Sequence, residues 1–156
     1  MAKFSFDGVD YISAKFEQLA QIDDEDKMSV IRPAAEFLKG KHQEKILSKF
    51  KKRTGTLAGS ITVEQKSDDD GAYAHISPKG KHPRSSTGKR MKLENGKRRS
   101  SGSYSGTNAE VAYILEYGSP RIPASHWMEE ANEEAADEVV AMQQEAWDQL
   151  ITEKGL

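Results

Sequence analysis

Apolar side chains recur at helical spacing in three stretches of the chain. The first stretch runs from Asp7 to Ala20, and the second runs from about Asp24 to Lys52. The third and most regular stretch begins after Ser125 and continues to about Thr152. Residues three or four positions apart lie on one face of an α-helix, so each stretch predicts a helix with one apolar face.

Local signals indicate where these helices bend and end. Pro33 lies inside the second stretch, so it either kinks that helix or marks its true first turn. Gly55 follows the basic end of the same stretch and is expected to take the left-handed conformation that terminates a helix. Ser125 is expected to cap the final helix.

Alternating polar and apolar positions follow the second helix. Ile61 and Val63 alternate with polar neighbours, and the residues AYAHIS, from Ala72 to Ser77, alternate in the same way. The intervening SDDDG is typical of a turn, so this region predicts a β-hairpin. A further strand is predicted at Ala109–Ala112, and Tyr113–Tyr117 is either its continuation or a helical turn. Gly118 is expected to end that element before a proline-rich extended segment.

These elements predict a single α+β domain over residues 1–156, a usual length for one domain. We expect a long helix, then a hairpin with a further strand in a small antiparallel sheet, and a C-terminal helix packed on that sheet. With 36% apolar and 31% charged residues, the core should be modest. There is no apolar signal segment and no bilayer-length apolar run, so we expect neither secretion nor membrane insertion.

The formal charge is distributed unevenly along the chain. The net charge is −2, but Lys79 to Arg99 holds nine basic residues and one acidic residue, which gives 9 − 1 = +8. The remainder carries 14 basic and 24 acidic residues, which gives −10. Residues 79–106 have too little apolar content to fold alone and predict a long basic loop.

The basic loop has two interpretations. It could be a solvated surface insertion, or a segment that follows the phosphates of a nucleic acid, and the concentration of charge favours the second. The candidate phosphate-binding residues are Lys79, Lys81, Arg84, Lys89, Arg90, Lys92, Lys97, Arg98 and Arg99.

No motif in the sequence indicates catalysis, a metal or a cofactor. There is no cysteine, the four histidines lack ligand spacing, and no serine lies in a nucleophile elbow. The segment GTLAGS follows a helix, which is the wrong order for a phosphate-binding loop. The carboxylates of the last helix are expected to form a solvated face, or a docking surface for a basic neighbour such as the loop of another subunit. We therefore expect no enzyme activity.

Two segments, taken in order, resemble a known protein family. RTGTLAGSI, Arg53–Ile61, follows a basic helix end, and VAYILEYGSPRIPASHWMEEA begins at Val111. They resemble the tail-completion proteins of long-tailed bacteriophages, also called head–tail joining, neck or tail-terminator proteins. That family pattern is a helix, Thr-Gly-x-Leu-x-x-Ser-Ile, Tyr-x-x-x-x-Glu-x-Gly-[Thr/Ser], and a proline-rich step into a helix. The matching positions are Thr54, Gly55, Leu57, Ser60, Ile61, Tyr113, Glu116 or its neighbour, Gly118, Ser119, Pro123, Trp127, Met128 and Ala131.

The resemblance implies a virion structural protein that closes into a ring in the neck, with a hexamer as the implied number. Such a ring sits between portal-side connector proteins and the tail-tube protein, with genomic DNA in its lumen, and is assembled in the host cytoplasm. His126 and Trp127 stand where the family often has Pro-Phe, and the basic loop is longer than the family pattern. The alternative is a small DNA-binding module that uses the basic loop without forming a ring.

Roles for the matching residues follow from these two interpretations. The turn is expected to fix the angle between helix and sheet through Arg53, Thr54, Gly55, Leu57 and Ser60. Contacts between subunits or with neighbouring rings are expected at Tyr113, Tyr117, Gly118, Pro123 and Trp127. In a ring, the basic loop is a candidate to face the lumen and its DNA, or to contact an acidic neighbouring ring.

Overall fold

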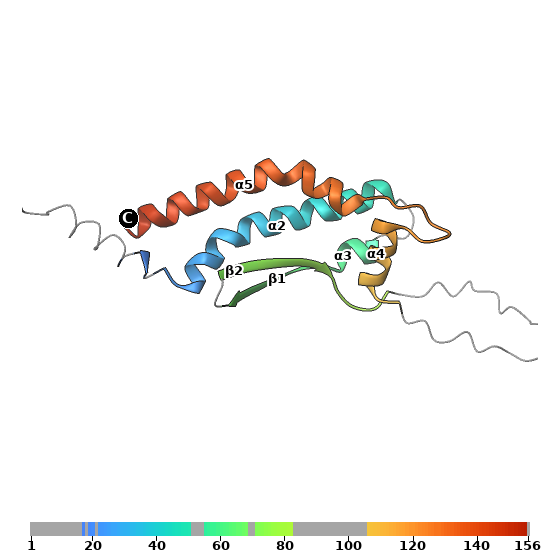
Figure 1. Ribbon diagram of the computed structural model, residues 1–156, viewed down its shortest axis with the longest axis horizontal. Coiled ribbons are helices and arrows are strands. Elements are labelled where there is room, and N and C mark those ends of the chain that lie inside the picture. Colours follow the sequence, from blue (N-terminus) through green and yellow to red (C-terminus); the bar gives the residue numbers. More distant parts are fainter. Residues whose placement is uncertain are drawn as a thin grey trace, which may run out of the picture. The chain divides into compact units, whose positions relative to one another are not determined.

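The computed structural model of the chain is shown in Figure 1 and describes residues 17, 19–20, 22–50, 55–68, 71–82 and 106–155. In chain order, its elements are α2 (Asp24–Lys49), α3 (Gly55–Gly59), β1 (Ile61–Asp68), β2 (Gly71–Pro78), α4 (Asn108–Tyr117) and α5 (Trp127–Glu153). The first predicted helix, apart from residues 17, 19 and 20, lies outside the described residues.

The α+β class is confirmed, with a long helix, a two-stranded antiparallel sheet and a C-terminal helix. The strands pair as a hairpin in which the Thr62 hydroxyl donates to the Ser77 carbonyl at 3.2 Å. The Lys79 N–H donates to the Ser60 carbonyl at 2.8 Å, two residues further out on each side. These contacts form the predicted hairpin, and turn residues 69 and 70 lie outside the described part of the chain.

The further strand predicted at Ala109–Ala112 is wrong, because these residues belong to α4. A capping box begins that helix. The Thr107 hydroxyl accepts the Glu110 N–H at 3.1 Å, and the Glu110 carboxylate accepts the Thr107 N–H at 2.8 Å. Two backbone donors at the helix start are thereby satisfied, which outweighs the strand preference of the β-branched and aromatic residues that follow.

Two other local predictions are corrected by the structure. Gly55 is not a left-handed helix end, because it begins α3 without a positive φ, and a Cβ built on it meets nothing within 4 Å. Pro33 does not mark the first turn of the long helix, which begins nine residues earlier at Asp24. Gly118 does end its helix, as predicted, with φ 82°.

The chain divides into two compact units, and the first comprises residues 1–38, 63–75 and 135–156. Its α2 segment starts with a reciprocal cap between Asp23 and Asp26, in which each carboxylate accepts the other's N–H. Lys154, just after α5, forms an ion pair with Asp26 at 2.6 Å. The buried apolar side chains of this unit are Val30, Ala34, Ala35, Ala135 and Leu150.

The second unit comprises residues 39–62 and 76–134 and contains the cluster of buried apolar side chains that forms its core. Trp127 and Ile46 are fully buried in it, and Leu57 and Ile61 are almost so. Ala58 and Ala112 complete this cluster, and Phe50, Ile76 and Leu115 pack against it. Burying large apolar side chains is the main driving force for folding. The largest buried side chains among the described residues lie in this unit, so burial stabilises it most.

No helix in the described ranges is both long enough and apolar enough to cross a bilayer.

Candidate interaction site at the α4–α5 corner

The two sequence segments that carry the family resemblance meet in the core of the second unit. Leu57 and Ile61 come from the first segment, and Ala112 and Trp127 come from the second. Ser60 closes α3, because both its N–H and its hydroxyl donate to the Leu57 carbonyl, at 3.1 and 2.7 Å. Of the other predicted turn residues, Arg53 and Thr54 lie outside the described residues.

Glu116 is a buried carboxylate that caps α5 from a different helix. Only 4% of the residue is exposed. One of its oxygens accepts the Met128 N–H at 2.7 Å, and the other accepts the Glu129 N–H at 3.2 Å. A negative charge is favourable at a helix N-terminus, where the backbone donors have no partner within the helix. Glu116 therefore fixes where α5 begins relative to α4.

Ser125 does not have the capping role that the sequence predicted. Its hydroxyl donates to the Leu115 carbonyl at 2.6 Å, and its N–H donates to the same oxygen at 3.0 Å. It therefore holds the incoming chain against α4, while the amides that it was expected to cap are taken by Glu116.

Gly118 makes the turn between the two helices possible. Its φ of 82° is in the left-handed region, and its N–H donates to the Ile114 carbonyl at 2.9 Å. A Cβ at this position would lie 2.7 Å from the Ala124 nitrogen and 3.0 Å from the Ile122 carbonyl oxygen. Only glycine allows both this conformation and this close backbone approach. The structure thus gives Gly118 a folding role, whereas the sequence suggested a contact residue.

His126 lies beside two carboxylates, an association that the sequence did not indicate. Its Nδ1 is 3.0 Å from Glu129, three residues on, and the two ligand atoms lie within 4.8 Å of a Glu116 oxygen. His126 also has an unusual φ of 48°. All three groups surround the N-terminal end of α5, where the helix dipole disfavours a cation and the Glu116 oxygens already accept two amides. Capping of α5 therefore accounts for the position of Glu116, and His126 and Glu129 form an exposed pair beside it.

His42 is the buried histidine of the second unit. Its Nε2 is 2.8 Å from the Asn132 Oδ1, and its ring meets Trp127 edge-on with centroids 5.7 Å apart. Burial lowers the pKa of His42, while the hydrogen bond to Asn132 and the charge of Glu116 act in the opposite direction. The Trp127 Nε1 is a buried donor without a hydrogen-bond partner among the described residues.

The basic end of α2 is paired with the acidic start of α5. Lys45 contacts Glu130 and Glu134, and Lys49 contacts Glu130. The hydrogen bond from Lys49 is the main reason that the pKa of Glu130 is lowered, and the hydrogen bond to Glu134 is the main reason that the pKa of Lys45 is raised. Two of the acidic residues expected to form a solvated face therefore have partners within the fold.

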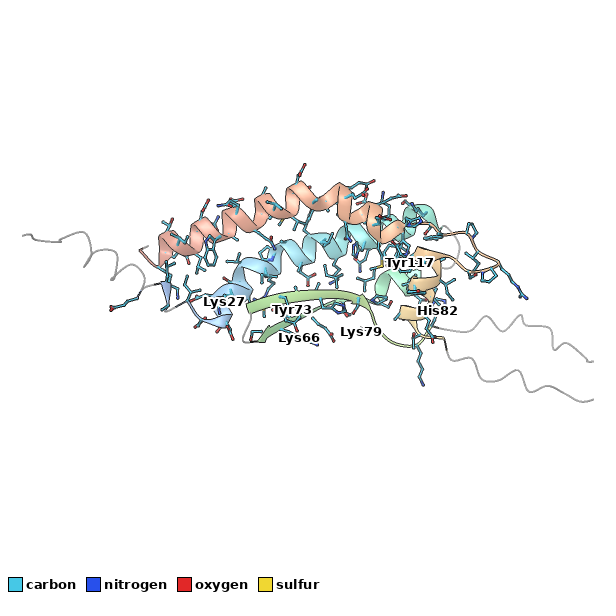
Figure 2. All side chains as sticks on the ribbon, in the orientation of Figure 1. Lys27, Lys66, Tyr73, Lys79, His82 and Tyr117 are labelled. Carbon is cyan, nitrogen blue, oxygen red and sulfur yellow. The ribbon has the colours of Figure 1, made fainter. Side chains whose placement is uncertain are left out.

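An aromatic pair dominates the exposed surface of this corner. Tyr113 and Tyr117, one helical turn apart on α4, are each 64% exposed, and their ring centroids are 4.8 Å apart. Tyr117 is labelled in Figure 2. Ile122 and Pro123 add exposed apolar surface on the turn that follows. Trp127, expected beside them as a contact residue, is fully buried in the core and is not available to a partner in this fold.

A short hydrogen-bonded ladder closes the base of the basic loop. Lys81 pairs with Thr107, the His82 N–H donates to the Gly106 carbonyl at 2.9 Å, and the Asn108 N–H donates to the Gly80 carbonyl at 3.0 Å. The buried Asn108 side chain reinforces this ladder. Its Nδ2 donates to the Lys79 carbonyl at 2.7 Å, and its Oδ1 is 2.9 Å from the His82 Nδ1.

The predicted basic residues are thus only partly placed by the structure. Lys79 and Lys81 are exposed at the base, and Lys79 is labelled just beyond β2 in Figure 2. The other seven lie outside the described residues, namely Arg84, Lys89, Arg90, Lys92, Lys97, Arg98 and Arg99.

The described part of this corner combines buried polar side chains with exposed aromatic and apolar side chains. Two of its buried polar side chains have structural roles, because Glu116 caps α5 and Asn108 closes the base of the basic loop. Its exposed side chains include the aromatic pair Tyr113 and Tyr117 and the apolar Ile122, together with the acidic Glu129. Comparison of the chain with protein-family models, curated proteins and solved structures found no match.

Proposed function

We propose that this chain is a virion structural protein of a tailed bacteriophage, joining head to tail as an oligomeric ring in the neck. In this proposal it contacts portal-side connector proteins and the tail-tube protein, and it has no catalytic chemistry of its own. The proposal includes a hexamer as the number of copies and genomic DNA as the occupant of the lumen.

The packing of the two motif segments supports the proposal in addition to their sequence similarity to the family. The two segments that resemble the tail-completion family are far apart in the sequence, yet their apolar residues Leu57, Ile61 and Trp127 belong to one core cluster. Glu116 and Gly118, both in the second segment, then fix the corner geometrically. The motif residues thus support a common architectural role, and the corner leaves Tyr113 and Tyr117 outside for contact with a neighbour.

A paired substitution tests whether this surface mediates assembly. The double change Tyr113→Ser and Tyr117→Ser should abolish the oligomer, because exposed aromatic side chains commonly dominate the energy of an interface. Leu47→Ser on α2 is the matched control, since Leu47 is also exposed, at 52%, but lies outside the corner. Light scattering gives the mass of each variant, and circular dichroism checks that it is folded. A double variant with an unchanged oligomeric mass would contradict the proposal for this surface.

The alternative function is a small DNA-binding module. The hydrogen-bonded base of the basic loop is the observation that supports it. In this alternative, the +8 segment contacts phosphates, and the hydrogen bonds at its base anchor its two ends. DNA binding by a monomer that weakens steeply as the salt concentration rises from roughly 50 to roughly 200 mM would support this alternative. A closed ring that does not bind DNA would rule it out.

A further inference from the structure

The β1–β2 hairpin is a sheet of two strands, and both of its outer edges are open in the described part of the chain. Each strand is eight residues long, and no third strand pairs with either of them among the described residues. The isolated bridges in the described ranges lie elsewhere, at Lys81–Thr107 and Ser119–Ile122. An open strand edge presents N–H and C=O groups that can pair with another strand.

The register of the hairpin identifies which backbone groups point outward. The Lys79 N–H donates to the Ser60 carbonyl, so these two residues form a hydrogen-bonded pair, and such pairs recur at every second residue along the ladder. The inward-facing groups of β1 therefore belong to residues 62, 64 and 66, and those of β2 belong to residues 73, 75 and 77. Between the strand ends, the outward-facing groups belong to Val63, Gln65, Ser67, Ala72, Ala74 and Ile76.

Two features that commonly block such edges are missing from these strands. The strands have equal length in one uniform register, so the ladder contains no bulge. Proline occurs only as Pro78, the last residue of β2, and β1 contains none. At eight residues, both strands are also longer than the usual length of about five or six. Each edge therefore offers a regular row of backbone donors and acceptors.

The side chains of the outward-facing residues share one face of the sheet. On this face Ile76 packs against the core cluster, and Val63 and Ala74 are half-buried. The other face includes the exposed Lys66 and Tyr73, which are labelled in Figure 2. A strand added at either edge would continue both faces, so it must alternate apolar or small residues with polar ones. The strands β1 and β2 themselves have this pattern.

We propose that the β1 edge of one copy pairs with the β2 edge of a second copy, so that the hairpins join into one antiparallel sheet. The inference rests on the proposed ring and names a contact that would close it. A ring needs two different patches that fit each other head to tail. The outer edges of β1 and β2 are two such patches, because they lie on opposite sides of the hairpin and the strands run in opposite directions. Closure of the ring would leave neither edge open.

The residues along the two edges suit this contact. In the register that the hairpin itself uses, the outward-facing groups would form three pairs with two hydrogen bonds each, about six in all. Val63 would then lie opposite Ile76 of the second copy, which pairs two β-branched side chains. No like charges would meet on the other face, where the opposing residues would be Glu64 with His75 and Lys66 with Tyr73.

Proline substitutions test each edge separately in the full-length chain. Gln65→Pro removes an outward-facing N–H of β1, and Ala74→Pro removes one of β2, while the ladder between the two strands keeps its donors. We expect each variant alone to self-associate at least about tenfold more weakly than the wild type, because the lost donor leaves a carbonyl of the neighbour unpaired. Sedimentation velocity measures each dissociation constant, and circular dichroism checks that each variant is folded.

The matched controls change the same side chains and keep the N–H groups. Gln65→Thr and Ala74→Ser should self-associate within about twofold of the wild type, because surface substitutions of this kind have small effects. If the controls associate as weakly as the proline variants, the side chains and not the backbone edges make the contact, and the inference is overturned.

Mixing the two proline variants tests the head-to-tail arrangement. Gln65→Pro retains an open β2 edge, and Ala74→Pro retains an open β1 edge. Equal amounts of the two should therefore form a dimer of 2 × 17.4 = 34.8 kDa that cannot grow further. Two results would contradict the proposed pairing, namely absence of this mixed dimer and dimerisation of Ala74→Pro alone, which would indicate that two β1 edges pair.

Amide hydrogen exchange of the wild type provides a test that needs no substitution. The outward-facing amides of Gln65 and Ala74 should exchange at least about tenfold more slowly in the oligomer than in the monomer obtained by dilution. The ladder amides of Lys66 and Tyr73 should be protected in both states. Equal exchange of the outward-facing amides in both states would overturn the inference. Protection that appears only when portal-side or tail-tube components are added would do the same, because the edges would then bind another protein.

The edge contact and the proposed ring fail in different ways. Rings of wild-type mass in both proline variants would exclude the edge contact and leave the ring intact. Absence of any oligomer in the wild-type chain would remove the ring and the contact together.

Discussion

A few residues at the α4–α5 corner determine its geometry through contacts that are distant in sequence. Glu116 binds two amides at the start of α5, twelve and thirteen residues further along the chain. Gly118 lets the backbone of Ile122 and Ala124 approach closely. Each of these contacts is made by a single residue. Single substitutions can therefore distinguish residues that stabilise the fold from residues that bind a neighbouring subunit.

Replacing Glu116 should destabilise the fold without removing any surface contact. Glu116→Gln keeps the volume but turns an NH2 group toward a backbone donor, which we expect to cost about 1–3 kcal/mol in the free energy of unfolding. Urea denaturation followed by circular dichroism measures the change. Glu129→Gln, at an exposed position nearby, should cost less than ~0.5 kcal/mol. Equal effects of the two variants would show that Glu116 is not the cap.

Two glycines should respond to alanine in opposite directions. Gly118→Ala introduces a Cβ 2.7 Å from the Ala124 nitrogen at a positive φ, so we expect a loss of at least about 2 kcal/mol. Gly40→Ala, within α2, meets nothing within 4 Å and should gain about 0.5–1 kcal/mol from helix propensity. Thermal unfolding of both variants is the measurement. A stable Gly118→Ala protein would mean that the turn can rearrange freely.

His42 should make stability depend on pH on the acid side of neutrality. Its pKa in the fold is below the ordinary value of 6.5, so the unfolded chain takes up its proton first as the pH falls. Stability is therefore full above about pH 6.5 and declines as the pH falls below it, by no more than ~1.4 kcal/mol for each pH unit from this one group. Urea midpoints at about pH 7.5 and about pH 5.5 test this. The difference should shrink in His42→Gln, and an unchanged difference would assign it to other groups.

Among the secondary-structure elements, the periodic apolar patterns predicted the long helices correctly. Local signals from single residues, such as glycines and possible caps, predicted element boundaries less well. The helices α2 and α5 follow the predicted stretches because one-sided burial imposes a helical repeat, with Ala131, Ala135 and Leu150 buried as expected. The strand predicted at 109–112 is wrong, because these residues are helical. Thr107 and Glu110 have the Thr-x-x-Glu spacing of a capping box, which is the sequence signal that indicates a helix here.

Other features of the candidate site could not be read from the sequence. The cap by Glu116, the clamp by Asn108 and the burial of Trp127 all depend on which segments meet in three dimensions. Gly55 illustrates the opposite error. A glycine after a basic helix end suggested a left-handed residue, but a short helix begins there instead. The local sequence allowed both outcomes, because glycine restricts the backbone least of all residues.

The ladder at the base of the basic loop predicts that the loop can be shortened without unfolding the unit. Replacing residues 84–104 with a four-residue turn should leave the unit folded and raise its free energy of unfolding by about 1 kcal/mol, because a shorter loop costs less entropy to close. Asn108→Ala should instead lose about 1–3 kcal/mol, since it leaves the Lys79 carbonyl without its partner. Unfolding of the shortened chain would show that the loop belongs to the core.

For the molecule as a whole, we infer a protein whose function is assembly. The described core is concentrated in a few side chains such as Trp127, Ile46 and Leu57, while aromatic and acidic surfaces remain outside. Association between copies would bury the exposed tyrosine pair. That burial would add stability that the single chain lacks.

The native mass of the purified full-length chain is the decisive measurement for assembly. We expect a closed oligomer at micromolar concentration, with six copies giving 6 × 17.4 kDa, about 104 kDa, and the mass staying constant over a broad concentration range. A particle that remains at 17.4 kDa at every concentration, even with portal-side and tail-tube components present, would contradict the proposed ring.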